Sequence, residues 1–223
     1  MEQQNANYVC VCCGKAAENL FRRYSPELIE VSKCADCGQI ADAYIENDHM
    51  ITLIDVILLR TQAFRHVLYN TDFREHWTLK LIAFSCLAEA YHHWALEHSD
   101  QQAITAAIEF SFYMKLTAAV LGVIGQTLTA LILLALFSPS IKGSYEEQKM
   151  RAQCIALSNY SVLYLIVIHI WSAPSALYGY YLLKLYKAAT CFVAMKTMTT
   201  AHPLALATTS ILSCGIDLWM NLH

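Results

Sequence analysis

The sequence is poor in charged residues, which make up 15% of its 223 positions, against about 25% in typical soluble chains. Hydrophobic residues make up 57%, where roughly 45–50% is usual. This composition excludes an intrinsically disordered chain and predicts a membrane protein. The formal net charge of −3 leaves no broad basic surface to neutralise a phosphate backbone, so we expect no nucleic-acid partner.

Motifs of several enzyme classes are also missing. The sequence has no glycine-rich phosphate loop and no G-x-S-x-G nucleophile elbow, which nucleotide-driven pumps and α/β-hydrolases need. We therefore expect a protein that is not an enzyme. Residues 1–9 have neither a basic start nor an apolar core, so no cleavable signal peptide is predicted and the N-terminus is expected in the cytosol.

Four cysteines near the N-terminus form two pairs. Cys10 with Cys13, and Cys34 with Cys37, have C-x2-C spacing, and 20 residues separate the pairs. This pattern is typical of a zinc ribbon, in which four thiolates surround the metal and leave no position for water or substrate. We therefore predict a structural zinc. The alternative is two disulfides, which the odd total of nine cysteines and the expected cytosolic location disfavour; Cys12 is the spare thiol.

The fold class predicted is a mostly α, multi-span helical membrane protein with a small N-terminal zinc-ribbon-like β domain. Residues 1–48 are the cytosolic ribbon, with strands expected at 19–21 and 28–31 and a turn at 25–26. Residues 49–76 are an amphipathic region. Residues 77–223 are a transmembrane domain of four to five helices.

Residues 50–69 have a helical hydrophobic pattern, which predicts one amphipathic helix. Its apolar arc also holds Arg60, whose stem would lie along that arc while its guanidinium reaches headgroups. The helix would either lie in the membrane interface or pack on the ribbon, and both interpretations stay open. The apolar arc contains Leu53, Val56, Ile57, Phe64, Val67 and Leu68, and the opposite arc contains Asp55, Gln62, Arg65 and His66.

Four segments are long and apolar enough to be spans. Residues 116–137 carry no charge and would extend about 33 Å as a helix, enough for a ~30 Å hydrocarbon core. Residues 77–96, 154–173 and 203–222 are the others. Residues 175–195 contain four tyrosines, Lys184 and Lys187, and would form either a tilted fifth span or an interfacial segment.

The positions of lysine and arginine orient these spans. The head and residues 138–153 carry them, whereas residues 97–109 have none. The positive-inside rule therefore places the head and the 138–153 loop in the cytosol. It also favours five spans, because a fifth span would bring Lys196 to the cytosol, while the cost of burying Lys184 and Lys187 opposes this.

Three ionisable residues share one face of the span at 77–96. Glu89, His92 and His93 lie at positions i, i+3 and i+4, and ionisable groups within a membrane are candidates for function. We expect them to contact neighbouring helices or lipid headgroups. A catalytic di-metal site is the alternative, but such sites need several Glu-x-x-His motifs on facing helices. His169, alone in its span, is expected to be a packing residue.

Three stretches in this order resemble the homology domain of the Arv family: the paired cysteines, Tyr-Ile-Glu-Asn-Asp at 44–48, and Gln-Ala-Phe-Arg-His-Val-Leu-Tyr-Asn at 62–70. The close resemblance covers roughly residues 8–70. Members of that family are endoplasmic-reticulum membrane proteins of sterol and lipid homeostasis.

The resemblance implies a multi-pass protein of the endoplasmic reticulum that mediates or regulates intracellular sterol and lipid transport. Its partners would be membrane lipids, sterols and membrane proteins of lipid metabolism, and it would assist the synthesis of glycosylphosphatidylinositol (GPI) anchors. Two alternatives are kept. One is an intramembrane lipid-modifying enzyme that uses Glu89, His92 and His93, and the other is an adaptor that recruits partners through its zinc ribbon.

Overall fold

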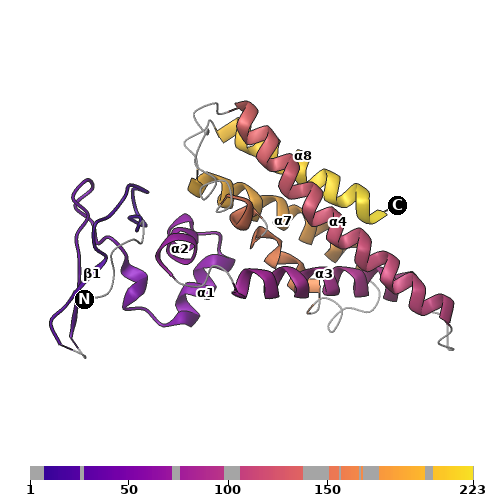
Figure 1. The fold of residues 1–223 in the computed structure, drawn as a ribbon, viewed down its shortest axis with the longest axis horizontal. Coiled ribbons are helices and arrows are strands. Elements are labelled where there is room, and N and C mark those ends of the chain that lie inside the picture. The colour runs from indigo at the N-terminus through magenta and orange to yellow at the C-terminus, as the bar shows by residue number, and fades with distance from the viewer. Residues whose placement is uncertain are drawn as a thin grey trace. The chain divides into compact units, whose positions relative to one another are not determined.

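The computed structural model describes residues 8–25, 28–71, 76–97, 106–137, 151–155, 157–165, 167, 176–198 and 203–222 (Figure 1). The chain forms two compact units, Met1–Glu75 and His76–His223, which we call the head unit and the helical unit.

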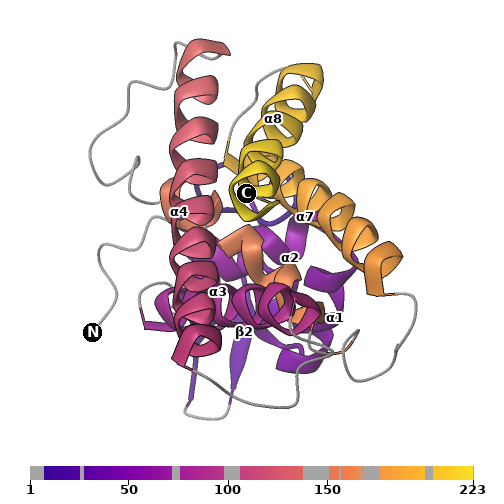
Figure 2. The same ribbon diagram turned by 90° about the vertical axis from the view of Figure 1, so that its right-hand side faces the viewer.

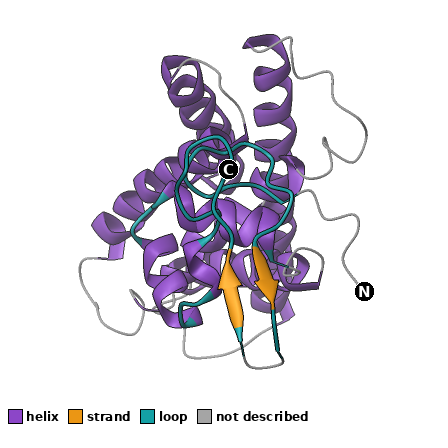
Figure 3. Cartoon of the chain, turned by 90° about the vertical axis from the view of Figure 1, so that its left-hand side faces the viewer, coloured by secondary structure: helices purple, strands orange, loops and turns teal. Residues whose placement is uncertain are grey.

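The head unit begins with a small β element. Strand β1, Phe21–Arg23, pairs antiparallel with β2, Ile29–Val31, and the hairpin is the only sheet in the described residues (Figure 3). Isolated bridges join Val9 to Ala16 and Lys33 to Ile40. The small N-terminal β element predicted from the sequence is therefore confirmed.

Short helical segments complete the head unit. They are the 3-10 helix η1, Ala43–Ile45, then α1, His49–Ile57, then α2, Thr61–Arg65, and the π-helical turn η2, His66–Asn70. Asp48 caps α1, because its carboxylate accepts a hydrogen bond from the Met50 amide at 3.2 Å.

The prediction of one continuous helix over residues 50–69 is wrong. Leu59 has a φ of 59°, and α1 ends there in a Schellman motif. The Arg60 amide donates to the Asp55 carbonyl at 3.0 Å, and the Leu59 amide donates to the Val56 carbonyl at 3.0 Å. This kind of helix end usually has a glycine at the left-handed position. Because Leu59 stands there instead, the sequence gives no signal that the helix ends.

In the described part of the helical unit there are four long helices: α3, His76–Glu97, α4, Ala106–Phe137, α7, Ala176–Met198, and α8, Pro203–Leu222. Helix α4 packs along α8 and also against α3 (Figures 1 and 2). Helix α7 packs against α8 and against the 3-10 helix η5, Ser158–Leu163, which also contacts α3. Residues 109–136 are the one stretch of the described chain that is long and apolar enough by itself to cross a membrane.

The described part of the predicted span at 154–173 contains the 3-10 helix η5, and two side-chain hydroxyls donate to one of its carbonyls. The Thr190 hydroxyl donates to the Ser158 carbonyl at 2.9 Å, and the Ser161 hydroxyl donates to the same atom at 3.4 Å. His169 and Pro174 lie outside the described residues.

The helical unit has buried apolar clusters, but it also buries many polar side chains and exposes large apolar ones. Leu79 on α3, Leu136 on α4, Leu185 on α7 and Leu204 on α8 are each about 70% exposed. The buried polar residues of this unit are Thr78, Ser85, Glu89, His92, Gln126, Ser158, Asn159, Ser161, Lys184, Lys187, Thr190, Thr209, Ser210 and Ser213. Buried ionisable side chains together with exposed leucines on four helices are unusual for a soluble domain.

Candidate functional site

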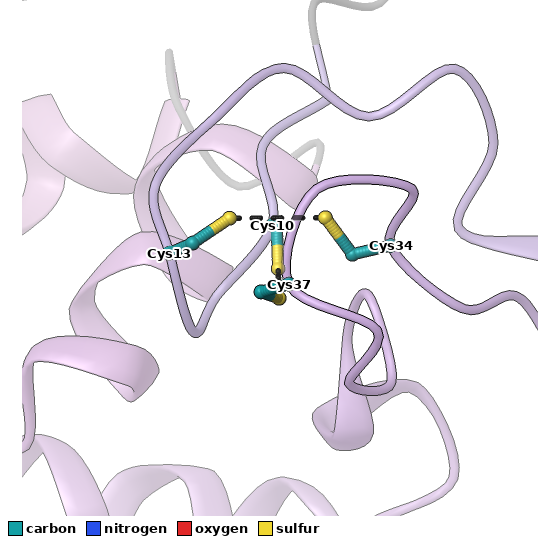
Figure 4. Close-up of side chains that lie close together, drawn as sticks. All are labelled: Cys10, Cys13, Cys34 and Cys37. Carbon is teal, nitrogen blue, oxygen red and sulfur yellow. Dashed lines mark hydrogen bonds between the residues drawn. The ribbon is translucent and has the colours of Figure 1, made fainter.

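The four predicted cysteine ligands converge in the head unit (Figure 4). Their sulfur atoms all lie within 4.8 Å of one another. Cys10 Sγ is 3.8 Å from Cys37 Sγ, and Cys13 Sγ is 3.7 Å from Cys34 Sγ. A tetrahedral zinc with Zn–S bonds of about 2.3 Å places its sulfurs about 3.8 Å apart, so these separations fit the metal. A disulfide would need about 2.05 Å, and all nine cysteines are free thiols.

The backbone of each knuckle turns back toward its first cysteine. The Gly14 amide donates to the Cys10 carbonyl at 2.9 Å, and the Gly38 amide donates to the Cys34 carbonyl at 3.0 Å. Both glycines have positive φ angles, 79° and 70°, in a region that other residues enter only with strain. The local sequence C-x2-C-G therefore closes both turns.

The first cysteine of one pair, Cys10, and the first cysteine of the other, Cys34, differ in the pKa of their thiols. Burial raises the pKa of the Cys10 thiol to about 12, even though the amides of Cys13 and Cys12 lower it. The amides of Cys37 and Asp36 lower the pKa of Cys34 to about 7. Backbone amides that face the sulfurs stabilise thiolates, which are the form that binds zinc.

Arg65 holds the first knuckle from outside. Its Nη1 donates to the carbonyls of Val11 at 2.9 Å and Cys12 at 2.8 Å. The nearby Gln62 amide donates to Cys12 Sγ at 3.6 Å, so Cys12 points toward α2 and is not one of the four clustered sulfurs. Arg65 and Gln62 were predicted on the polar arc of a helix that would either lie in the membrane interface or pack on the ribbon, and the structure shows that both side chains contact the ribbon.

A buried carboxylate joins the ribbon to η2. Asp42 is fully buried and accepts three hydrogen bonds: from the Tyr44 amide at 2.9 Å, from His66 Nδ1 at 2.7 Å and from Asn70 Nδ2 at 2.7 Å. Asn70 also exchanges two hydrogen bonds with the Val9 backbone, at 3.0 and 2.9 Å. We call Asp42, His66 and Asn70 the clasp, because they fasten the segment 62–70 to the ribbon.

A second buried carboxylate orients α1. Asp55 is 8% exposed and accepts hydrogen bonds from the Tyr44 hydroxyl at 2.8 Å and from Arg60 at 3.1 Å. Burial, and then the bond to Asp55, raise the pKa of Tyr44 to about 12. The helical projection placed Asp55 on the polar arc opposite the apolar one, whereas in the structure Asp55 is buried and pairs with Arg60.

In the helical unit, α3 and α7 are joined by a buried ion pair. Lys184 donates to Glu89, and the side chains are 9% and 1% exposed. His93 Nε2 lies 3.2 Å from the Tyr180 hydroxyl, and the His92 ring stacks on the Tyr180 ring at 5.1 Å between centroids. Each of the three polar residues predicted on α3 thus has a contact within the bundle.

Comparisons with known proteins identify the family of this chain. The family model described as "Arv1-like family" matches residues 9–196. This chain belongs to the Arv1-like family. The earlier resemblance is thereby confirmed, and the match extends well beyond residue 70 to include α3, α4 and most of α7.

The Arv1-like chain is similar to named relatives over most of its length. It is 31% identical to Protein ARV1 of Mus musculus over 206 residues, which cover 89% of this chain and 77% of the relative. It is 32% identical to Protein ARV1 of Homo sapiens over 173 residues (75% and 63%), and 30% identical to Protein ARV 1 of Arabidopsis thaliana over 170 residues (74% and 68%). No solved structure matches the chain.

Sequence reasoning missed three residues that organise the Arv1-like fold: Asp42, Tyr180 and Lys184. Asp42 has no local signal, because it lies among small residues that read as a loop. A signal for the other two exists. Tyr180 and Lys184 have the same four-residue spacing as Glu89 and His93, and matched spacings of complementary groups on two helices indicate a shared interface.

Proposed function

We propose that this chain is a multi-pass membrane protein of the endoplasmic reticulum that mediates or regulates the distribution of sterols and other lipids among membranes. Membership of the Arv1-like family supports the role in sterol and lipid homeostasis. Transport of sterols and lipids, and assistance to GPI-anchor synthesis, are the finer roles that the family resemblance implies, and both are part of the proposal.

The observation that carries the membrane part is that the helical unit exposes large apolar side chains while it buries ionisable and polar ones. Four helices each expose a leucine at about 70%, while Glu89, Lys184 and Gln126 lie inside. In lipid, apolar side chains face outward at no cost, and polar side chains are stabilised by pairing with one another. In water the same surface would form a large apolar patch of the kind that causes aggregation.

The ion pair between Glu89 and Lys184 supports a span for α7. The sequence argument against this span was the cost of burying Lys184 and Lys187, and the pairing of Lys184 with a buried carboxylate reduces its share of that cost. We therefore favour α7 as a span, with the head in the cytosol by the positive-inside rule.

The contacts of Glu89, His92 and His93 support interhelical packing over catalysis. An enzyme would need these groups to face a substrate, whereas Glu89 binds Lys184 and His93 approaches Tyr180. The adaptor alternative is favoured by the ribbon, whose four-thiolate site would leave the metal no coordination position for chemistry.

Comparison of lipid distribution in cells with and without the protein tests the proposal. We expect its loss to redistribute sterol among fractionated membranes, and we expect the intact chain to restore the distribution. If a single lipid disappears while its precursor accumulates, the enzyme alternative replaces the proposal. Purified protein in liposomes with labelled sterol and phospholipid then separates transfer from regulation, because only a transporter moves lipid without other proteins.

Glycosylation acceptors test the topology. We expect an acceptor placed between α3 and α4 to be glycosylated, and likewise an acceptor added after His223 if α7 is a span. Glycosylation of an acceptor in the head would contradict the orientation.

A further inference from the structure

Helix α1 turns an apolar face outward from the head unit. Five large side chains on α1, and that of Leu58 just after it, are between 36% and 60% exposed. They are Met50, Ile51, Leu53, Ile54, Ile57 and Leu58. We call these six residues the outer face of α1. A soluble domain would normally place such residues in its core.

The inward side of the same helix is polar. Thr52 and Asp55 are 7% and 8% exposed, and Asp55 is fixed by Tyr44 and Arg60 at 2.8 and 3.1 Å. The orientation of α1 is therefore set by hydrogen bonds to buried groups. Rotating the helix to bury its outer face would break both bonds and leave the Asp55 charge unpaired.

The segment that follows α1 differs from it. Ala63, Phe64 and Leu68 are 0%, 3% and 4% exposed, and Ala63 packs against Val11 of the ribbon. The head unit therefore has a core of its own, and α1 does not supply its outer face to that core.

The chain itself keeps α1 near the bilayer if the helical unit is inserted. Only four residues separate Thr71, the last described residue of the head unit, from His76, the first residue of α3. A chain of this length spans at most about 18 Å. Such a short tether gives the outer face a high effective concentration at the membrane surface. Even a weak affinity of the outer face for lipid would then keep it bound most of the time.

We infer that the outer face of α1 lies in the interfacial layer of the membrane that holds the helical unit, among glycerol groups and upper acyl chains. Apolar contact with lipid provides the binding, and the exposed Arg60, which follows α1, lies at headgroup level. The inference rests on the proposed membrane insertion. It differs from the interfacial helix expected from sequence, because the inserting residues come from α1 alone and Phe64 and Leu68 are excluded.

Photocrosslinking of the full chain tests this inference. Benzoylphenylalanine replaces one isoleucine at a time in protein reconstituted into phosphatidylcholine vesicles that contain labelled phosphatidylcholine. The test position is Ile54, which is 51% exposed; the control in the head unit is Ile40, at 42%; the reference in α4 is Ile132, at 59%. We expect lipid adducts at Ile54 and Ile132, and roughly tenfold fewer at Ile40, since burial of one large apolar side chain favours the inserted state by about that factor.

The three positions separate the inference from the proposal on which it rests. Lipid adducts at Ile132 with none at Ile54 overturn the inference and leave membrane insertion standing. An absence of adducts at both positions contradicts both. Crosslinks from Ile54 to a second copy of the chain, or to the helical unit, also overturn the inference, because they identify a protein surface as the occupant.

A matched pair of substitutions adds a second measurement. Leu58 in the outer face and Leu28 in the β1–β2 hairpin are each 60% exposed. We expect Leu58→Glu to reduce lipid adducts at Ile54 roughly tenfold and Leu28→Glu to leave them unchanged, with zinc content equal in both variants as proof of a folded ribbon. Equal adduct yields in the two variants would refute the role of the outer face.

Discussion

The clasp residue Asp42 provides the sharpest test of how the head unit is held together. We expect Asp42→Ala to destabilise this unit far more than Asp48→Ala. Asp42 is fully buried and accepts three hydrogen bonds at 2.7 to 2.9 Å, whereas Asp48 lies at the surface and accepts one at 3.2 Å. The two substitutions remove the same chemical group from different environments.

The magnitudes differ by a factor of several. A hydrogen bond to a charged group contributes about 1.5–3 kcal/mol, and removal of one partner from a buried charged cluster costs about 3–5 kcal/mol. We take the lower figure, about 3 kcal/mol, for Asp42→Ala. Loss of the Asp48 N-cap costs about 1 kcal/mol. A unit of this size has roughly 4–11 kcal/mol of stability in total, so the first loss is a large share.

The assay is the temperature at which zinc passes from the full chain, in detergent, to a coloured chelator. At about 4–8 °C per kcal/mol, we expect release to shift downward by at least about 12 °C for Asp42→Ala and by about 4–8 °C for Asp48→Ala. Asp42→Asn keeps one acceptor oxygen and should fall between them. If the two alanine variants release zinc at the same temperature, the clasp does not stabilise the ribbon.

Three further outcomes are expected. Elemental analysis should find about one zinc per chain, which is lost on substitution of Cys10, Cys13, Cys34 or Cys37 by serine and kept in Cys12→Ser; loss in the Cys12 variant would mean that the ligand set is wrong. Gly14→Ala should destabilise the head more than Gly38→Ala in the same chelator assay. Both positions have positive φ, but a Cβ at Gly14 would lie 3.0 Å from the Arg65 guanidinium, whereas nothing lies within 4 Å of a Cβ at Gly38. Equal losses of stability in the two variants would show that the Arg65 side chain moves aside without cost. In the helical unit, Glu89→Gln and Lys184→Met should each lower thermal stability in detergent, because each single change leaves a buried charge without its partner. The double variant should lose less stability than the sum of the two single losses. Additive losses would argue that the two side chains do not interact.

Two features of the head were accessible from local sequence because short-range spacing encodes them. Cysteines three residues apart, followed by glycine, can close only a narrow set of turns, so the pattern predicted which four sulfurs would meet. The β-hairpin was predicted for a similar reason, because alternation along a few residues is enough to define a strand.

The course of the chain from residue 50 to 70 could not be predicted in this way. The hydrophobic pattern is continuous there, and the break at Leu59 arises from a left-handed residue that is not glycine. The two interpretations that the sequence left open apply to different parts of the segment: α2 and η2 pack on the ribbon, while α1 keeps its apolar face exposed.

The sequence by itself determined the family, the cysteine cluster, the small β element and the apolar stretch at 116–137, because each depends on residues close together in the chain. Only the tertiary structure decided that Asp42 joins the ribbon to η2 and that Glu89 meets Lys184, 95 positions away. A buried polar group must find a partner, but its own sequence neighbourhood does not specify which distant residue packing will bring to it.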